Sequence, residues 1–394
     1  MRVAVLAWTA QRLGGIEAYL SLVLPAMARA GLDLAFWYEH HETGERQPID
    51  LPSETPLFSA AELGAAGAIQ RLRDWKPDVL YVHGLHDTSA ERDLLRIAPA
   101  VQFVHTYIGT CVSGTKTHTR PGMIACDRQF GAACLAYYFP RGCGGNSPST
   151  MWNLYREQSR RLALLREYRA VLTHSAHMQS ELDRHGVRST VVPFPVTSTP
   201  GPNDYRGGAA LNLLFAGRMD ALKGGAFLLD TLPDVQRQLG RPLRLTMAGD
   251  GRDRREWGER ARTIQAANSN IEVTFPGWRT ADQLDVLMAR TDLLVVPSVW
   301  PEPFGSVGPT AAQHGVPAAA FAVGGIPQWL REGVNGHLAP GHPPSASALA
   351  KAIVSCVQDP HHYAALCSGA RKVGASFTMD RHLPELMRIF KQVA

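Results

Sequence analysis

Long apolar runs are missing from this sequence. Residues 1–8 carry one charge and form only a short apolar run, with no small-residue cleavage site after it. A membrane-spanning helix needs roughly 20 apolar residues, and no stretch approaches that length. These features argue against a spanning helix and a secretion signal, and residues 1–8 are better explained as a first strand. We expect a cytoplasmic protein, with peripheral contact to the inner face of a membrane as the alternative.

Signatures for metal-held diphosphates and for dinucleotides are also missing. There is no D-x-D motif, and no strand–helix unit carries G-x-G-x-x-G. No Ser-His-Asp set and no pair of catalytic carboxylates is recognisable. The sequence therefore predicts neither a bound metal nor a dinucleotide cofactor.

Closely spaced cysteine pairs are absent too. Zinc sites usually contain two cysteines separated by about two to four residues, and this chain has no such pair. We favour reduced thiols, with a structural metal as the alternative. The strand and helix patterns break down over residues 110–148, and so long a loop in a compact domain is usually functional or mobile. That stretch holds four of the six cysteines, Cys111, Cys126, Cys134 and Cys143.

The basic residues are mostly arginine, and the formal net charge is +5. This excess is too small to indicate nucleic-acid binding, and we expect none. An amphipathic helix is predicted over residues 152–169. We favour a solvated basic face, and the alternative is a docking surface for a membrane or a phosphate-bearing acceptor. Its five arginines are Arg156, Arg160, Arg161, Arg166 and Arg169.

The chain of 394 residues is long enough for two or three domains. Apolar strands alternate with helical patterns in two successive halves, and residues 197–208 between them are rich in Pro, Gly and polar residues, as in a linker. The pattern predicts an α/β protein with two Rossmann-like domains, 1–197 and 210–379, whose parallel sheets face a central cleft.

Polar and glycine residues follow the predicted strands, at the edge where open α/β sheets bind ligands. Gly14 and Gly15 follow the first strand and let the backbone approach a phosphate or sugar, although a plain tight turn is the alternative. His83 and His105 each end a predicted strand. Such histidines are more often structural than catalytic.

One stretch combines several of these features. Residues 292–298 read as a buried strand, and a loop and a helix start follow at residues 302–317. A carboxylate begins this loop, at Glu302, and a glycine, Gly305, lies within it. Together with free N–H groups at the helix start, they form a site that can hold a sugar hydroxyl and a phosphate.

This stretch resembles the retaining glycosyltransferases of family 4, which have the GT-B fold. Their signature is E-x7-E within E-P-F-G, followed by G-x-P, and the residues kept are Glu302, Pro303, Phe304, Gly305, Gly315 and Pro317. Thr310 stands where the second glutamate is expected. In the family the first acid contacts the donor sugar and the second holds the ribose. The fold also implies that the last helix, about 380–394, packs back on the first domain.

The resemblance continues in G-R-x4-K-G after a later strand, which implies that Arg218 and Lys223 bind the donor diphosphate. Two permanent cations at a leaving diphosphate lower the barrier without a metal. The resemblance further implies catalytic positions for Glu302 and His105. His105 is the stronger candidate of the two strand-end histidines, because the family has a histidine in a similar position that contacts the donor sugar. The donor-binding positions that we infer are Gly14, Gly15, Gly217, Gly249, Gly251, Phe304, Gly305, Ser306, Val307 and Thr310.

The resemblance implies a retaining, metal-independent enzyme that moves a sugar from a nucleotide diphosphate sugar, of UDP or GDP type, to a hydroxyl acceptor. That acceptor is a glycan, a lipid-linked molecule or a small molecule, and residues 110–148 are the expected place for its recognition. One alternative is a catalytically weak nucleotide-sugar-binding protein or partner subunit, which Thr310 favours. A sugar-nucleotide epimerase is less favoured, because no acid–base pair for one sugar carbon is evident.

Overall fold

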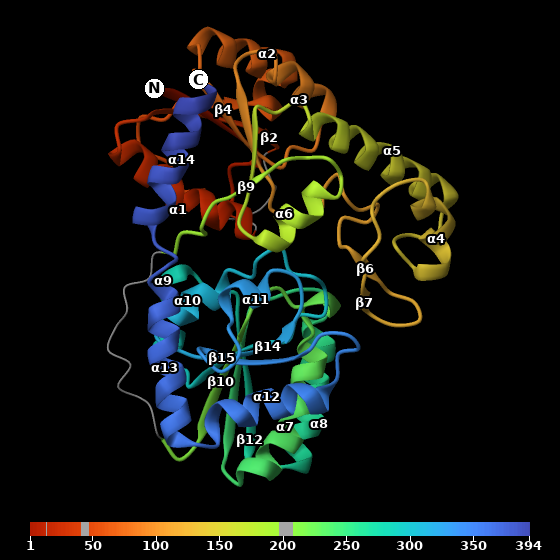
Figure 1. The fold of residues 1–394 in the computed structure, drawn as a ribbon, viewed down its shortest axis with the longest axis vertical. Helices are drawn as coiled ribbons and strands as arrows, with labels where there is room; N and C mark the ends of the chain where they lie inside the picture. Colours follow the sequence, from red (N-terminus) through yellow and green to blue (C-terminus); the bar gives the residue numbers. More distant parts are fainter. Residues whose placement is uncertain (13, 41–46, 197–207) are drawn as a thin grey trace. The chain divides into compact units, whose positions relative to one another are not determined.

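The computed structural model describes residues 1–12, 14–40, 47–196 and 208–394, so most of the predicted linker lies outside the described residues. The chain forms two compact units. Unit 1 comprises Met1–Lys116, Asp127–Pro195 and Thr378–Ala394, and unit 2 comprises Thr117–Cys126 and Val196–Phe377 (Figure 1). The sequence predicted one uninterrupted first domain, whereas Thr117–Cys126 groups with unit 2.

Unit 1 is built on a seven-stranded parallel sheet. The interior strand β1 (Arg2–Thr9) is mostly apolar and buried on both faces, as expected for a parallel sheet that is covered by helices. The strand order across the sheet is β3 (Leu57–Ser59), β2 (Asp33–His40), β1, β4 (Val79–His83), β5 (Ala100–Phe103), β8 (Ala170–Thr173) and β9 (Thr190–Val191). Its main helices are α1 (Gly15–Arg29), α2 (Ala60–Trp75), α3 (Thr88–Leu94), α5 (Pro148–Leu165), α6 (Ala176–Asp183) and α14 (Met379–Val393).

Helix α14 belongs to unit 1 although it follows unit 2 in the sequence. It lies beside α1 (Figure 1), and Nε2 of its His382 forms a hydrogen bond at 2.8 Å with the hydroxyl of Tyr19 in α1. The ring of Phe390 in the same helix packs edge-on against Tyr81 of β4. Helix α14 therefore completes the core of unit 1.

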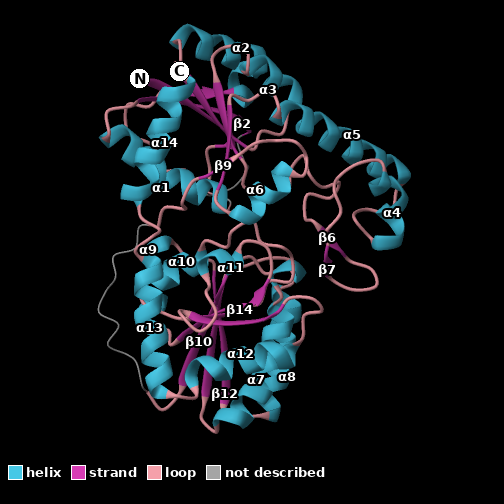
Figure 2. Cartoon of the chain, in the orientation of Figure 1, coloured by secondary structure: helices cyan, strands magenta, loops and turns pink. Residues whose placement is uncertain are grey.

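Unit 2 contains a six-stranded parallel sheet. Its strands lie between α13 on one side and α7 and α8 on the other (Figure 2). The strand order is β12 (Ile271–Gly277), β11 (Leu243–Ala248), β10 (Leu211–Ala216), β13 (Leu293–Val296), β14 (Ala318–Ala322) and β15 (Gly336–Pro340). Its helices are α7 (Gly225–Leu239), α8 (Arg254–Ala267), α9 (Ala281–Ala289), α10 (Val307–Gln313), α11 (Ile326–Trp329), α12 (Ala346–Val357) and α13 (Pro360–Gly374), with a short 3₁₀ turn at Ala221–Lys223.

The stretch over residues 110–148 is more regular than the sequence predicted. It contains helix α4 (Ala133–Arg141) and a small antiparallel pair, β6 (Thr117–His118) and β7 (Ile124–Ala125). Tyr138 of α4 is buried and packs with Val112 and Phe130 in a small hydrophobic core. Glycine and cysteine obscured the helical pattern, which is why the sequence did not reveal this local core.

The expectation of a fully solvated basic helix is wrong for one arginine. Helix α5 begins at Pro148, and Arg161 lies on its inner face with Gln158 and Leu164, where only 9% of the residue is exposed. The side chains of Arg156 and Arg160, by contrast, are exposed. Among the described residues, no helix is both long and apolar enough to cross a membrane.

Helix α13 provides a test of the packing in unit 2. Gly369 lies inside this helix, and a Cβ there would be 1.8 Å from the carbonyl oxygen of Val334. Because backbone must move to admit a methyl group, Gly369→Ala should lower the free energy of unfolding by about 1–3 kcal/mol. Denaturant unfolding followed by circular dichroism measures this change.

Gly258 in α8 of the same unit is the matched control. A Cβ at this buried helical glycine would meet only the guanidinium end of Arg254, at 3.2 Å, which can move aside. Gly258→Ala should leave stability unchanged or raise it by up to about 1 kcal/mol through helix propensity. Equal destabilisation by the two substitutions would contradict this account of α13.

Candidate functional site

The loops after β10, β11 and β13 meet at the carboxyl edge of the sheet in unit 2. Backbone hydrogen bonds join them, from Gly217 N to Ala248 O at 3.0 Å, from Met219 N to Asp250 O at 2.8 Å and from Val299 N to Leu222 O at 2.9 Å. In parallel sheets this edge is where ligands bind. The sequence predictions Gly217, Arg218, Lys223, Gly249, Gly251 and Glu302 all lie in these loops.

Glycines allow the loops to approach so closely. Gly249 has φ +139°, and a Cβ there would be 2.0 Å from the carbonyl oxygen of Gly217. A Cβ on Gly224, whose φ is +67°, would be 1.8 Å from the carbonyl oxygen of Pro297. Any side chain at either position would therefore separate the loops, and with them the charged residues that they carry.

The central interaction of this edge is an ion pair between Lys223 and Glu302. Lys223 Nζ donates to Glu302 Oε1 at 2.6 Å, and Ser298 Oγ donates to the same oxygen at 2.6 Å. The Glu302 side chain is 6% exposed and that of Lys223 is 23% exposed. A buried carboxylate requires such compensation, because an unpaired charge is costly away from water.

Arg218 lies in the same loop as Lys223 but faces solvent. Its Nε donates to Asp220 Oδ2 at 2.5 Å, and 68% of its side chain is exposed, against 8% for Asp220. The buried carboxylate orients the guanidinium, whose remaining surface faces water. The loop thus presents one fixed and one accessible cation, which suits binding of a phosphorylated ligand.

The predicted donor-binding residues after β13 are placed by α10 and α11. Phe304 is buried, and its carbonyl accepts a hydrogen bond from Trp329 Nε1 at 2.7 Å, so this phenylalanine supports the loop. Gly305 has φ +84°, and Ser306 directly precedes α10, which begins at Val307. Thr310 Oγ1 donates to the Ser306 carbonyl at 3.2 Å.

In unit 1 the two predicted histidines lie together. His83 Nδ1 and His105 Nε2 are 2.9 Å apart, although β5 ends at Phe103, two residues earlier than predicted. Burial lowers the pKa of His105 to about 3. It also lowers the pKa of His83 well below its usual value, and the nearby His105 and His382 lower it further. Both imidazoles are therefore neutral near pH 7.

Two further histidines of this cluster were not found from the sequence. The ring centroids of His174 and Phe103 are 4.2 Å apart, and His382 Nδ1 donates to the Pro193 carbonyl at 2.7 Å. Burial lowers the pKa of His382 to about 4. His174 follows β8 as His105 follows β5, so strand-end position could have revealed it. His382 gave no signal because it lies in the last helix.

The glycine pair after β1 differs from the other glycines. Gly14 N donates to Glu17 Oε2 at 2.8 Å at the start of α1. A Cβ on Gly15 would meet nothing within 4 Å, so the protein itself does not require glycine there. Open space at Gly15 is compatible with a ligand approaching the backbone.

All six cysteines lie in the described part of the chain, and none of them forms a disulfide. Cys111 Sγ accepts a hydrogen bond from Lys116 N at 3.3 Å, while Cys134 and Cys143 pack against the local core around Tyr138. Within the described part of the chain, no group of three His, Cys, Asp or Glu residues is placed to hold a metal ion.

Comparison with known proteins gives two family matches. Residues 13–198 match the model described as Glycosyltransferase Family 4, and residues 210–359 match the model described as Glycosyl transferases group 1. A D-inositol 3-phosphate glycosyltransferase of Salinispora arenicola is 35% identical over 118 residues, which cover 30% of this chain and 26% of that protein. An uncharacterized glycosyltransferase of Methanocaldococcus jannaschii is 27% identical, over 45% of this chain and 44% of its own. The matched stretches thus span less than half of either relative.

Two solved structures share the fold across the whole chain. HepE of Anabaena, in complex with UDP and glucose, has a TM-score of 0.70 at 18% identity and covers 99% of both chains. TarM of S. aureus, in a complex that contains UDP, has a TM-score of 0.71 at 10% identity and also covers 99% of both. At these identities the likeness establishes the fold alone.

The histidine cluster should make stability depend on pH. Because the folded state depresses the pKa of His105 and His382, the unfolded chain binds more protons below about pH 6.5. Stability is complete above that pH and is lost as pH falls toward 4, by about 1.4 kcal/mol per pH unit for each such histidine. His382→Gln should reduce this dependence, measured as the free energy of unfolding at several pH values. An unchanged dependence of the free energy of unfolding on pH would refute the conclusion that His382 contributes to it.

Proposed function

We propose that this chain, which belongs to the glycosyltransferases of family 4 and has the GT-B fold, transfers a sugar from a nucleotide diphosphate sugar to a hydroxyl acceptor. The observation that carries the proposal is the Lys223–Glu302 pair beside the exposed Arg218 at the strand ends of unit 2. This arrangement combines two cations for a diphosphate with a fixed carboxylate for a sugar hydroxyl.

The proposed step needs no metal and retains the anomeric configuration. The bond between the sugar's anomeric carbon and the diphosphate oxygen breaks, and its electron pair leaves with the diphosphate. The acceptor oxygen attacks the same face, and its proton passes to the departing diphosphate. Arg218 and Lys223 stabilise the negative charge that develops on the leaving oxygens. No protein nucleophile takes part.

Glu302 has a positioning role in this proposal. Ser298 and Lys223 both donate to Oε1, which fixes the plane of the carboxylate. We assign Oε2 to accept a hydrogen bond from a hydroxyl of the donor sugar. Because the same carboxylate holds Lys223, the position of the sugar and the position of the cation are linked.

We infer a uridine nucleotide, with a guanosine nucleotide as the alternative. Both HepE and TarM were solved with UDP, which supports this choice. Thr310 replaces the family's ribose-binding glutamate, and its hydroxyl already donates to the Ser306 carbonyl. It can therefore only accept from a ribose hydroxyl, and we expect a weaker ribose contact than a carboxylate would give.

We assign acceptor recognition to residues 110–148, which lie mostly in unit 1, and we assign His105 to the positioning of a hydroxyl during the reaction. His105 is neutral near pH 7 because burial lowers its pKa to about 3, so it can exchange hydrogen bonds with a sugar or polyol hydroxyl without adding charge. The relative from Salinispora arenicola is named for an inositol phosphate, which makes polyols reasonable first acceptors to test.

We place the reaction in the cytoplasm, with contact to the inner membrane face as the alternative. Trp152 of α5 is 49% exposed, and Arg156 follows one turn later on the exposed side. An exposed tryptophan beside arginines suits the headgroup region of an anionic bilayer.

The second candidate is a nucleotide-sugar-binding protein or partner subunit with little activity, which Thr310 favours. We disfavour an epimerase, because that reaction needs an acid and a base at one sugar carbon. Glu302 accepts hydrogen bonds from Lys223 and Ser298, and we assign it a positioning role rather than a place in such a pair.

Nucleotide binding separates these functions. Among UDP, GDP, ADP and TDP and their sugars, one nucleotide should raise the melting temperature, and its sugar should be hydrolysed slowly with release of the diphosphate. Stabilisation without hydrolysis, and without transfer to sugars, polyols or inositol phosphate, would favour the binding protein. No response to any nucleotide would contradict the proposal.

Removing either cation tests the chemical step. Arg218→Gln and Lys223→Gln should each lower kcat by about 100-fold or more, because charge on the leaving diphosphate loses a partner. The KM for the acceptor should change by less than about threefold. Steady-state kinetics with the stabilising donor measures both quantities.

Arg255→Gln is the matched control, since Arg255 is an exposed arginine of α8 outside these loops. It should leave kcat unchanged. Equal losses in kcat and in acceptor affinity for Arg218→Gln would refute the assigned role.

A further inference from the structure

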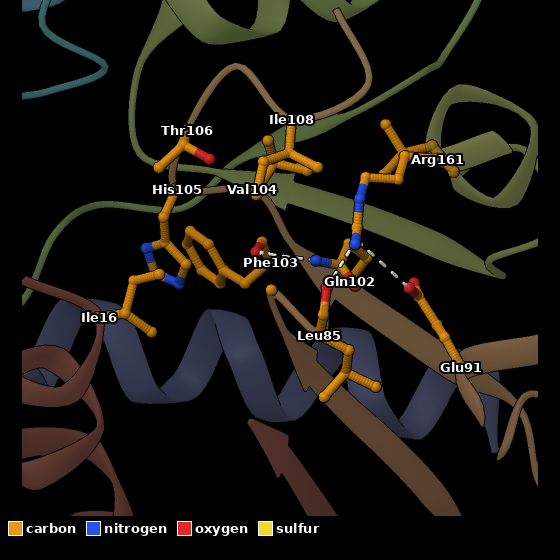
Figure 3. Close-up of a pocket in the computed structure, with 12 residues that line it drawn as sticks. Ile16, Leu85, Glu91, Gln102, Phe103, Val104, His105, Thr106, Ile108 and Arg161 are labelled. Atoms are coloured by element: carbon orange, nitrogen blue, oxygen red, sulfur yellow. Dashed lines mark hydrogen bonds and ion pairs between the residues drawn. The ribbon is translucent and has the colours of Figure 1, made fainter. Parts of the chain in front are cut away.

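Unit 1 contains a small pocket beside His105, with a volume of about 30 Å³. Figure 3 shows His105 and Ile16 at one end and Arg161 with Glu91 at the other. Between them the walls are largely aliphatic, from Leu85, Val104, Ile108 and Leu165. The volume suffices for one or two water molecules, or for one small group of a larger ligand, but not for a sugar ring.

The charged end of the pocket is already compensated. The Arg161 guanidinium donates to the carbonyls of Leu85 at 2.6 Å and His86 at 2.5 Å, and it pairs with Glu157 at 2.7 Å. Glu91 lies 3.8 Å from the same guanidinium and accepts a hydrogen bond from Tyr168. Burial raises the pKa of Glu91 to about 7. An anion would meet no uncommitted cation here, and a cation would meet the buried guanidinium.

Gln102 supplies a group without a partner. This residue lines the pocket and is 7% exposed. Its Nε2 donates to the Phe103 carbonyl at 3.3 Å, whereas its Oε1 accepts no hydrogen bond from any described residue. A buried carbonyl oxygen that accepts no hydrogen bond destabilises the protein, because it has lost its contact with water without gaining a partner. The pocket therefore favours a ligand that donates a hydrogen bond.

We propose that this pocket binds a neutral hydroxymethyl group, whose CH₂ contacts the aliphatic walls and whose O–H donates to Gln102 Oε1. Size excludes a ring, and the compensated charges disfavour ions. Identifying this group as part of the acceptor rests on the proposed function. In that case Gln102 is a specificity-determining residue, which favours acceptors with a primary alcohol over those that lack it.

Three probes of similar size and different charge test the pocket directly. Saturation-transfer NMR on the full chain with ethanol, acetate and ethylammonium reports weak binding without any catalysis. The ethanol signals should show saturation transfer from the protein, and the signals of acetate and ethylammonium should show none. Gln102→Leu should weaken ethanol binding about fivefold through loss of one hydrogen bond. Ile108→Phe, which fills the pocket, should also abolish the ethanol signal.

The control is Gln70→Leu, which makes the same change at an exposed position of α2 and should leave the signal intact. Circular dichroism shows whether each variant is folded. Equal saturation transfer to all three probes, no transfer to ethanol, or an unchanged ethanol signal in folded Gln102→Leu would overturn the proposal. No transfer to ethanol would indicate a permanently bound water, and an unchanged signal in Gln102→Leu would show that ethanol does not donate to Gln102 Oε1. Because no donor is needed, failure of glycosyl transfer is detected separately.

Discussion

A buried carboxylate that must stay paired organises the site in unit 2. Glu302 and Lys223 come from the loops after β13 and β10, which are neighbouring strands of the sheet. Loss of one partner from a buried pair typically costs about 3–5 kcal/mol, because the other charge remains without compensation. The pair therefore holds the two loops in register, and the accessible Arg218 takes its position from the loop that the pair fixes.

Glycine in these loops has two roles that the sequence cannot separate. Gly249 and Gly224 are needed for the loops to touch, whether or not a ligand is present. Gly15 is different, because nothing in the protein itself fills the space beside it. Of the glycines that the resemblance assigns to donor binding, Gly249 is explained fully by packing. A Cβ on Gly14 or Gly217 would make only ordinary contacts, at 3.7 and 3.8 Å, and one on Gly15 would make none, so packing does not explain these three glycines.

The apolar runs of the sequence predicted the buried strands, because burial of a parallel strand depends on its own side chains. The strand β13 has the predicted core Leu293–Val296 because its apolar run is buried on both faces. The sequence placed His83 and His105 at strand ends but not beside each other; they are close because β4 and β5 pair in the sheet. His382 could not be predicted, since its place depends on how a distant helix docks. The burial of Arg161 was missed because the periodicity of a helix does not show what its side chains contact. In the fold Arg161 donates to the backbone carbonyls of Leu85 and His86.

The return of α14 to unit 1 has a consequence during translation. The ribosome completes β1 to β9 first, yet the hydroxyl of Tyr19 lacks its contact with His382 until all of unit 2 has been synthesised. Unit 2 has its sheet and helices available before the last helix emerges. The unit encoded first is therefore the one finished last, and a ribosome that stalls in α13 leaves the aromatic core of unit 1 without the helix that covers it.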